Sequence, residues 1–283
     1  MVLAAAVEPE EICAKYTNKY VPPPAAVAAA KECNGCNREL AERFANADGV
    51  ERNFEIAEYF LCRAQEEMGP MEFENMFAHV QRMRSGEDTD PLDFCDYVSS
   101  GYGETYCANA RYDKVMPRLK MRLDALRAKV TAGEQFDAVR KRGEAYADVE
   151  SQRIGEQARG GSGFVAVSTS AEVDQKERFV VNLERWSNAR AAGASIAEAR
   201  RAENSLNAAY RAAQKKIDKT GEDEIANWKS FLRDAQRAWI AYRDAFAIYY
   251  VARWRGEASP AMLRREIVTH LTRERTAELR GEQ

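Results

Sequence analysis

The chain has 283 residues, of which 45% are hydrophobic, and its formal net charge is −3. This length and composition support one large domain or two to three small ones with buried cores, and exclude a disordered chain. The longest apolar runs, such as 245–252, are far shorter than the ~20 residues that a bilayer crossing needs, so we expect no membrane span.

The charge is unevenly distributed along the chain. Residues 1–100 carry 9 basic and 19 acidic residues, whereas residues 101–200 carry 17 and 14, and residues 201–283 carry 16 and 12. An acidic first third favours a basic partner and argues against nucleic acid as the ligand. The alternative interpretation is a solvated acidic surface without a partner.

All six cysteines lie in the first 107 residues, and their even number predicts disulfides formed in an oxidising compartment. The pairing is left open, because six cysteines allow about 15 arrangements. The Cys33-x-x-Cys36 spacing is also found in zinc and redox sites, but the chain has only two histidines, His79 and His270, and no second such motif. We therefore expect no metal. The predicted disulfide cysteines are Cys13, Cys33, Cys36, Cys62, Cys95 and Cys107.

The first residues, MVLAAAVEPEE, lack the basic and apolar regions of a signal peptide. The three alanines before Val7 nevertheless resemble the end of a cleavage site. We therefore expect an exported protein whose signal peptide has been largely trimmed.

Helical periodicity dominates the sequence in chain order. Residues 50–69 and 71–84 form amphipathic patterns that place Phe60 and Phe77 inward, and a polar break with Pro91 follows. His79 borders the second apolar face and is interpreted as a half-buried helix residue. Further helices are predicted from Met116, with Pro117 in the first turn, and over 136–157 and 173–186.

The last part of the chain predicts three helices, over 195–221, 224–254 and 259–280. Ser195 and Glu198 form a capping-box pattern at the first, and Ser259 followed by Pro260 marks the start of the third. The middle helix is about thirty residues, or about 45 Å, long. Its aromatic residues recur at steps of three and four, which predicts a packing seam on which Trp239 and Tyr242 are buried.

Arg243 and Asp244 border this aromatic stripe. Charged groups beside a buried stripe usually find partners. We expect Arg243 to pair with a residue of a neighbouring helix, namely Glu274, Glu278 or Asn207. Such a pair fixes the packing register and takes no part in chemistry.

These three helices also resemble a known family. The blocks LNAAY, AQRAWIAYRD and LTRERTAEL, spaced in this order within about residues 196–281, are similar to the pattern of bacterial LprI-type lysozyme inhibitors. Family members often carry a disulfide near the second and third blocks, but Phe246, Ala247 and Val268 stand there in this chain. The motif positions are Leu206, Asn207, Tyr210, Gln236, Trp239, Tyr242, Arg243, Asp244, Thr272 and Arg275.

A weaker similarity lies about 96 residues earlier. A shift of 96 sets Tyr146 on Tyr242 and Asp148 on Asp244, but sets Gly143 where the motif tryptophan stands. This predicts either a divergent tandem copy or an unrelated helical bundle. The resulting prediction is an all-α protein of helical bundles in tandem: a cysteine-containing acidic helical region (1–100) stabilised by disulfides, a divergent bundle (101–192) and an LprI-like bundle (193–283).

The resemblance implies a protein of the bacterial envelope that binds and inhibits lysozyme or another peptidoglycan-cutting enzyme, without catalysis or a cofactor. We therefore predict a periplasmic inhibitor, or the immunity partner of a secreted antibacterial toxin, that blocks a basic cell-wall hydrolase. The alternative is a non-catalytic envelope scaffold or sensory module that binds a peptide or protein. An enzyme is disfavoured because no Ser-His-Asp set exists and no pair of carboxylates is singled out.

Occlusion of a substrate cleft requires an exposed loop. The glycine-rich segment at 158–164 and the segment 255–259 both connect helices, and glycine lets the backbone approach a partner closely. A phosphate-binding loop is disfavoured at 158–164 because no Gly-Lys-Ser/Thr follows. The candidate contact residues are Gly160, Gly161, Ser162, Gly163, Phe164, Arg255 and Glu257.

Overall fold

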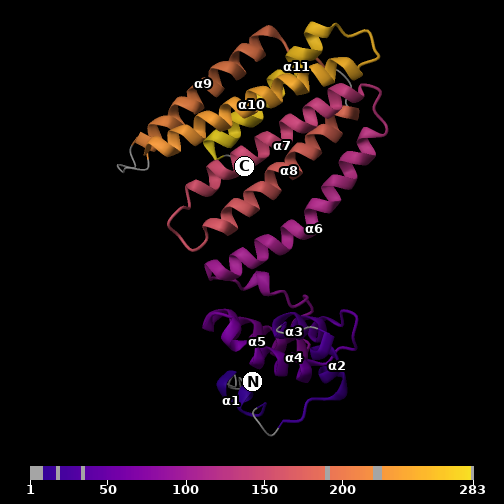
Figure 1. Cartoon of the computed structure of the whole chain (residues 1–283), viewed down its shortest axis with the longest axis vertical. Helices are drawn as coiled ribbons and strands as arrows, with labels where there is room; N and C mark the ends of the chain where they lie inside the picture. The colour runs from indigo at the N-terminus through magenta and orange to yellow at the C-terminus, as the bar shows by residue number, and fades with distance from the viewer. Residues whose placement is uncertain (1–8, 17–19, 33–35, 189–191, 219–224, 282–283) are drawn as a thin grey trace. The chain divides into compact units, whose positions relative to one another are not determined.

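The computed structural model describes residues 9–16, 20–32, 36–188, 192–218 and 225–281, and these contain helices and no strand. The all-α prediction is therefore confirmed. Residues 1–8, which contain the expected remnant of a signal peptide, lie outside the described residues, as does Cys33. The α-helices are α1 (Pro9–Ala14), α2 (Pro24–Glu32), α3 (Asn37–Asn46), α4 (Phe54–Arg63), α5 (Pro70–Ser85), α6 (Gly101–Arg127), α7 (Gly133–Glu156), α8 (Phe164–Asn188), α9 (Ile196–Asp218), α10 (Ile225–Arg253) and α11 (Pro260–Arg280), with short 3-10 turns at Gln65–Glu67 and Phe94–Asp96 (Figure 1).

The chain divides into two compact units, Met1–Glu104 (unit 1) and Thr105–Gln283 (unit 2). The division into three regions with boundaries at residues 100 and 192 was based on sequence patterns, and it stays a prediction. Within the described residues no helix is long and apolar enough to cross a membrane.

Unit 1 is a small helical unit built around α3, α4 and α5. Phe44, Phe60 and Phe77 are each almost completely buried between these helices. Asn53 caps α4 by accepting a hydrogen bond from the backbone nitrogen of Ile56 at 3.0 Å. A disulfide between Cys13 and Cys62 joins α1 to α4.

The prediction of structural disulfides in this region is confirmed. Cys36, Cys95 and Cys107 are also disulfide-bonded, and none of the described cysteines is free. Because such bonds form in oxidising compartments, they indicate a location outside the cytoplasm.

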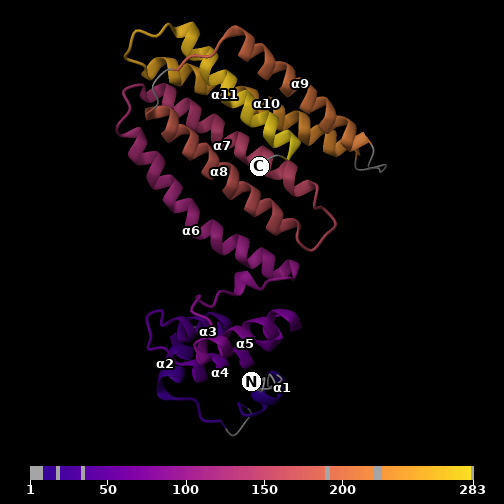
Figure 2. The ribbon, with the colours of Figure 1, turned by 180° about the vertical axis from the view of Figure 1, so that it is seen from behind.

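Unit 2 consists of two long antiparallel hairpins that pack against each other, with α6 and α9 on the two outer sides (Figures 1 and 2). One hairpin is α7–α8 and the other is α10–α11, and the main interface joins α7 to α10. Capping follows the sequence closely: Ser195 accepts a hydrogen bond from the backbone nitrogen of Glu198 at 3.1 Å, and Ser259 accepts one from Met262 at 3.3 Å.

The start of α6 differs from the prediction. Pro117 was expected in the first turn of a helix beginning near Met116, but the helix begins at Gly101 and Pro117 lies inside it. Proline removes one internal hydrogen bond, which a long exposed helix tolerates with a local bend. The C-terminal part of α6 contributes Leu119 and Leu123 to the core, whereas Arg111 and Arg122 form ion pairs with α8.

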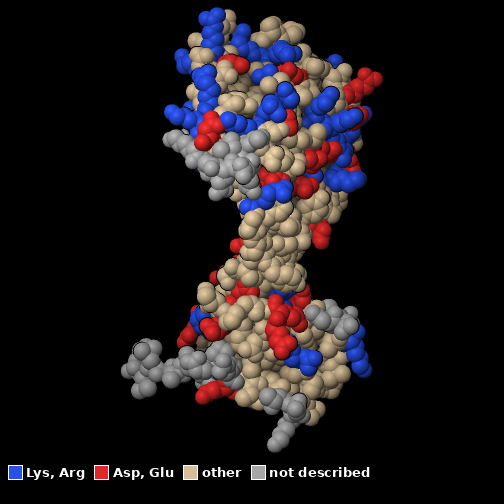
Figure 3. All heavy atoms as spheres, turned by 60° about the vertical axis from the view of Figure 1, so that its left-hand side comes forward, with Lys and Arg blue, Asp and Glu red and all other residues tan. Residues whose placement is uncertain are grey.

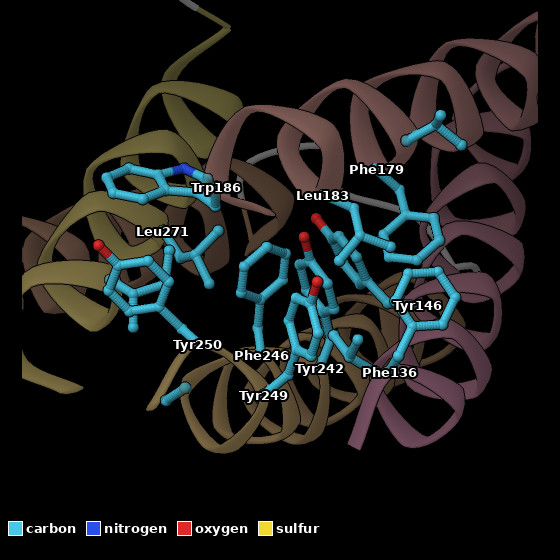
Figure 4. Close-up of a cluster of buried hydrophobic side chains, with 14 of the residues drawn as sticks. Phe136, Tyr146, Phe179, Leu183, Trp186, Tyr242, Phe246, Tyr249, Tyr250 and Leu271 are labelled. Carbon is cyan, nitrogen blue, oxygen red and sulfur yellow. The ribbon is translucent and has the colours of Figure 1, made fainter. Parts of the chain in front are cut away.

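The core of unit 2 is rich in aromatic rings, as the stripe on α10 predicts. Trp239 and Tyr242 are only 2% and 4% exposed, and Phe246, Tyr249 and Tyr250 are completely buried. Figure 4 shows the rings of the α10 residues Tyr242, Phe246, Tyr249 and Tyr250 gathered with those of Phe136, Tyr146 and Phe179 in the space between the helices. The interpretation of the stripe as a packing seam is therefore confirmed.

Candidate functional site

The centre of unit 2 contains a buried polar network built around Arg275 of α11. Its guanidinium group is completely buried and forms ion pairs with Glu150 of α7 at 2.8 Å and with Glu278 at 2.9 Å. It also donates hydrogen bonds to the hydroxyl of Tyr146 at 2.7 Å and to Gln236 at 3.2 Å. Three helices are therefore joined by one side chain.

The electrostatics of the network hold it in its charged form. Burial alone would raise the pKa of Glu150, but the guanidinium groups of Arg275 and Arg153 hold that pKa at about 2. Burial also raises the pKa of the Tyr146 hydroxyl well above its usual value. Neither Glu150 nor Tyr146 therefore changes protonation near neutral pH, as a general acid or base has to do.

The aromatic residues beside this network lie at the crossing of α7 and α10. The rings of Tyr146 and Tyr242 are stacked, with centroids 5.7 Å apart and planes 8° from parallel. Gly143 makes room for the ring of Phe179, because a Cβ atom on Gly143 would lie 2.3 Å from that ring. The residues related by the proposed 96-residue repeat, Tyr146 and Tyr242, thus meet face to face; the repeat itself stays a prediction.

One expected contact is wrong. Arg243 pairs with its neighbour Asp244 at 3.0 Å and lies 5.1 Å from the centre of the Trp239 ring, rather than contacting Glu274, Glu278 or Asn207. Arg243 lies at the edge of the stripe, where its planar group stacks on Trp239 and still reaches solvent. The buried arginine that holds the helices together is Arg275 instead.

The remaining motif positions divide into buried and exposed ones. Leu206 and Thr272 are 4% and 1% exposed and belong to the interior. Asn207 is exposed and Tyr210 is half-buried on α9. Most of the motif positions therefore contribute to packing, and the more exposed ones lie on α9 and at Asp244 of α10.

The two candidate loops lie at opposite ends of α7. The first, 157–163, follows α7, and its residues Gly160, Gly161 and Ser162 are exposed while Gly163 and Phe164 are half-buried. The second, 254–259, lies beside the segment that precedes α7, since Arg255 donates a hydrogen bond to the Thr131 hydroxyl at 2.9 Å. Glu257 is exposed. Because α7 has 24 residues, about 36 Å separates the two loops.

Two surface hollows, which the sequence did not predict, lie on unit 2. One of about 540 Å³ lies between α6 and the α7–α8 hairpin, with an apolar floor that includes Leu123 and Phe179. Charges on its rim pair with each other, as Lys176 does with Asp148 at 3.1 Å. The other, of about 320 Å³, lies between α9 and α11. Its lining includes three arginines and one carboxylate: Arg201, Arg273, Arg280 and Glu198.

The two units differ in surface charge. Unit 1 carries 9 basic and 20 acidic residues, a net charge of −11, and unit 2 carries 33 and 25, a net charge of +8, which together give −3. Figure 3 shows Lys and Arg spread across the face of unit 2 and Asp and Glu gathered on the face of unit 1.

The polar interior of unit 1 is fully occupied by structural contacts. His79 is 3% exposed, more deeply buried than predicted, and its ring nitrogens face the Asp90 carbonyl at 3.1 Å and the Tyr97 hydroxyl. The carboxylate of Glu58 is completely buried and contacts Lys15 and Arg84.

The order of the motif blocks agrees with one family. Residues 184–279 match the family model of the lysozyme inhibitor LprI. This LprI segment covers 96 residues, about a third of the chain, and begins twelve residues earlier than the resemblance in the sequence indicated, in α8 before Trp186. No curated protein and no solved structure matches the chain.

The LprI segment contains α9, α10 and α11, but residues that precede the segment contribute to its core. Glu150 and Tyr146, which bind Arg275, belong to α7 and precede the matched residues. The segment is thus one part of a larger helical body, and α7–α8 supplies the other side of its interior.

Proposed function

We propose that this protein is a periplasmic inhibitor that binds a peptidoglycan-degrading, lysozyme-like enzyme and blocks its substrate cleft. The same activity would serve as immunity against a secreted antibacterial toxin. The single observation that carries the proposal is the match of residues 184–279 to the LprI lysozyme inhibitors. The disulfide-bonded cysteines agree with export.

Occlusion needs a rigid body, and the buried network supplies rigidity. The motif residues Gln236 and Arg275 join α10 and α11 to α7, so loops and outer helices are held in fixed positions. Pre-ordered surfaces bind with a smaller loss of conformational entropy than flexible ones. The motif therefore supports inhibition indirectly, through the shape that it maintains.

The acidic surface of unit 1 favours a basic enzyme as the partner. A net charge of −11 on 104 residues attracts a positively charged rim and repels acidic proteins. Electrostatic matching of this kind mainly raises the association rate and sharpens partner choice.

The position of the loops limits how the enzyme is blocked. Because 160–164 and 255–259 are separated by the length of α7, they cannot both enter one narrow cleft. We place the 160–164 loop first, because Gly160, Gly161 and Ser162 are exposed and the loop forms a turn that protrudes between two helices.

The test is a titration of the purified full chain into muramidase assays with several enzymes, including basic lysozymes. We expect stoichiometric inhibition at micromolar or lower concentration, weakened by salt. An absence of inhibition across the panel, combined with an absence of binding in a direct assay, would overturn the proposal and favour a scaffold in the envelope.

A pair of matched variants identifies the end of the body that meets the enzyme. Ser162→Trp and Glu257→Trp each place a bulky ring on an exposed position of one loop. We expect Ser162→Trp to abolish inhibition and Glu257→Trp to leave it unchanged. The reverse result assigns the contact to the second loop, and no effect from either would show that the loops do not enter the cleft.

A further inference from the structure

The outer face of α9 carries positive charge that the protein does not neutralise. Arg200, Arg201, Arg211 and Lys215 are exposed and form no ion pair with any described residue. At 100° per residue they lie at about 0°, 100°, 20° and 60° around the helix, so they share one side. These four residues define the α9 basic face.

Acidic residues on α9 do not balance this face. Glu198 is engaged by the backbone nitrogen of Ser195 at 2.8 Å and by Arg273 at 3.5 Å, and Asp218 pairs with Lys229. Glu203 lies at about 300° on the same scale, at the edge of the face next to Arg200, and forms no ion pair with any described residue.

Several arginines on the other helices of unit 2 are neutralised by carboxylates. Arg111, Arg122 and Arg140 are each paired with a carboxylate at 2.6–2.9 Å. On α9, by contrast, Arg211 and Lys215 stand four residues apart, and like charges at this spacing destabilise a helix slightly. The charge of the α9 basic face is therefore not neutralised within the described residues.

The shape around this face suits insertion into a cleft. Among the described helices α9 packs against α10 and α11 and forms an outer layer of unit 2 (Figures 1 and 2). Beside it, the hollow of about 320 Å³ adds Arg273 and Arg280 to Arg201. Figure 3, which brings the left-hand side of Figure 1 forward, shows Lys and Arg across this part of unit 2.

We propose that the α9 basic face binds carboxylate side chains in the substrate cleft of the inhibited enzyme. This inference rests on the proposed function. Most enzymes that cut glycosidic bonds use a pair of Asp or Glu carboxylates in an open cleft. The arginine fork matches a carboxylate in geometry as well as in charge, and a single helix is a ridge about 10–12 Å wide.

The experiment uses the full chain and two matched triple variants. The test variant is Arg200→Glu, Arg201→Glu and Arg211→Glu, and the control is Arg118→Glu, Lys141→Glu and Arg142→Glu, which are exposed, unpaired positions on α6 and α7. Both variants change the net charge by −6. Far-UV circular dichroism checks that each keeps its helices.

The readout is the inhibition constant against a muramidase that the wild-type chain inhibits, at low and high salt. We expect the test variant to raise this constant by about tenfold or more and to reduce its salt dependence, and the control to change it by less than about threefold. Equal losses in both variants would show a net-charge effect, and unchanged inhibition in the test variant would show that the face is not used; either result overturns the inference but leaves the proposed function standing.

Two further outcomes separate the alternatives. If the test variant keeps inhibition but loses binding to vesicles that contain phosphatidylglycerol, the face binds a membrane surface and the inference is overturned. If the wild-type chain inhibits none of the muramidases, the proposed function fails, and this inference fails with it.

Discussion

The two units bury charge in different ways. In unit 1 the carboxylate of Glu58 is completely buried, but its partners Lys15 and Arg84 keep 46% and 39% of their side chains exposed. In unit 2 the partners of Arg275 are themselves interior, since Glu150 and Glu278 are 1% and 7% exposed. A small unit has a small interior, so the side chains that pair with its buried carboxylate lie partly at the surface.

The Cys13–Cys62 disulfide follows the same division, although Cys107, at the start of unit 2, is also disulfide-bonded. Unit 1 has about a hundred residues in short helices and is tied by the Cys13–Cys62 disulfide, whereas unit 2 has a continuous aromatic core between long helices. Small cores bury a smaller fraction of their surface and more often need a covalent link. The stability of unit 1 should therefore depend on bonds, and that of unit 2 on its network and packing.

The largest expected effect is the loss of Arg275. In Arg275→Ala the buried carboxylates of Glu150 and Glu278 lose the one fully buried cation that they share and keep only Arg153 and Arg178, which are partly exposed. We expect a loss of about 3–5 kcal/mol in the free energy of unfolding of unit 2. All four tryptophans lie in unit 2, so urea unfolding followed by tryptophan fluorescence reports on this unit alone.

The neighbour Arg273 provides the control. Its side chain is 57% exposed and 3.5 Å from Glu198, so Arg273→Ala should cost at most about 0.5 kcal/mol. Arg275→Lys keeps the charge but loses the fork, and should fall between the two. If Arg275→Ala unfolds at the same urea concentration as Arg273→Ala, the network is not what holds the helices together.

How far the sequence could anticipate this arrangement depends on the range of the contacts. Helix starts at Ser195 and Ser259, and the burial of Trp239 and Tyr242, follow from residues within a few turns of each other. Arg275 was recognised only as a motif position, because its partner Glu150 is 125 residues away. Arg243 was predicted to pair with a neighbouring helix because, like Arg275, it borders an apolar stripe. The sequence alone does not show which of the two arginines has its partner on another helix.

The surface features were harder still to predict. The charge asymmetry is visible in the composition, but the hollow beside α9 exists only because α11 lies next to that helix. The unpaired state of Arg201 likewise depends on which carboxylates the fold brings near it. The helical period predicts that the basic residues of α9 share one face. It does not predict which residues of other helices lie beside them.

The second effect, somewhat smaller, concerns the covalent bond of unit 1. The Cys13–Cys62 disulfide closes a loop with a sequence separation of 49, and its removal in Cys13→Ala/Cys62→Ala should cost about 2–4 kcal/mol. Far-UV circular dichroism should show an earlier transition for unit 1, while the tryptophan transition of unit 2 stays in place. A shift of the tryptophan transition by the same amount would show that the units do not differ in the way argued above.

The smallest expected effect is a pH dependence of the stability of unit 1. Burial raises the pKa of Glu42 from 4.5 to about 7, although its carboxylate accepts a hydrogen bond from the backbone nitrogen of Phe94 at 2.8 Å. The folded unit therefore holds a proton that the unfolded chain releases above pH 4.5, and stability falls as the pH rises from about 4.5 to about 7. Glu42→Gln keeps an acceptor for Phe94 and should be more stable than the wild type by about 1–2 kcal/mol at pH 8, with no difference at pH 4.

Glu72 supplies the opposite slope and thus the internal control. Burial would raise its pKa, but backbone N–H groups of Ser99, Gly69 and Ser100 hold it at about 2. The contribution of Glu72 to the free energy of unfolding is fully present above about pH 4.5 and is lost as the pH falls towards 2. Glu72→Gln should therefore destabilise unit 1 at neutral pH and have the same stability as the wild type near pH 2. Guanidinium unfolding by circular dichroism at pH 2 to 8 compares the two variants. Parallel pH profiles for Glu42→Gln and the wild type would show that Glu42 is ionised in the folded unit as freely as in the unfolded chain.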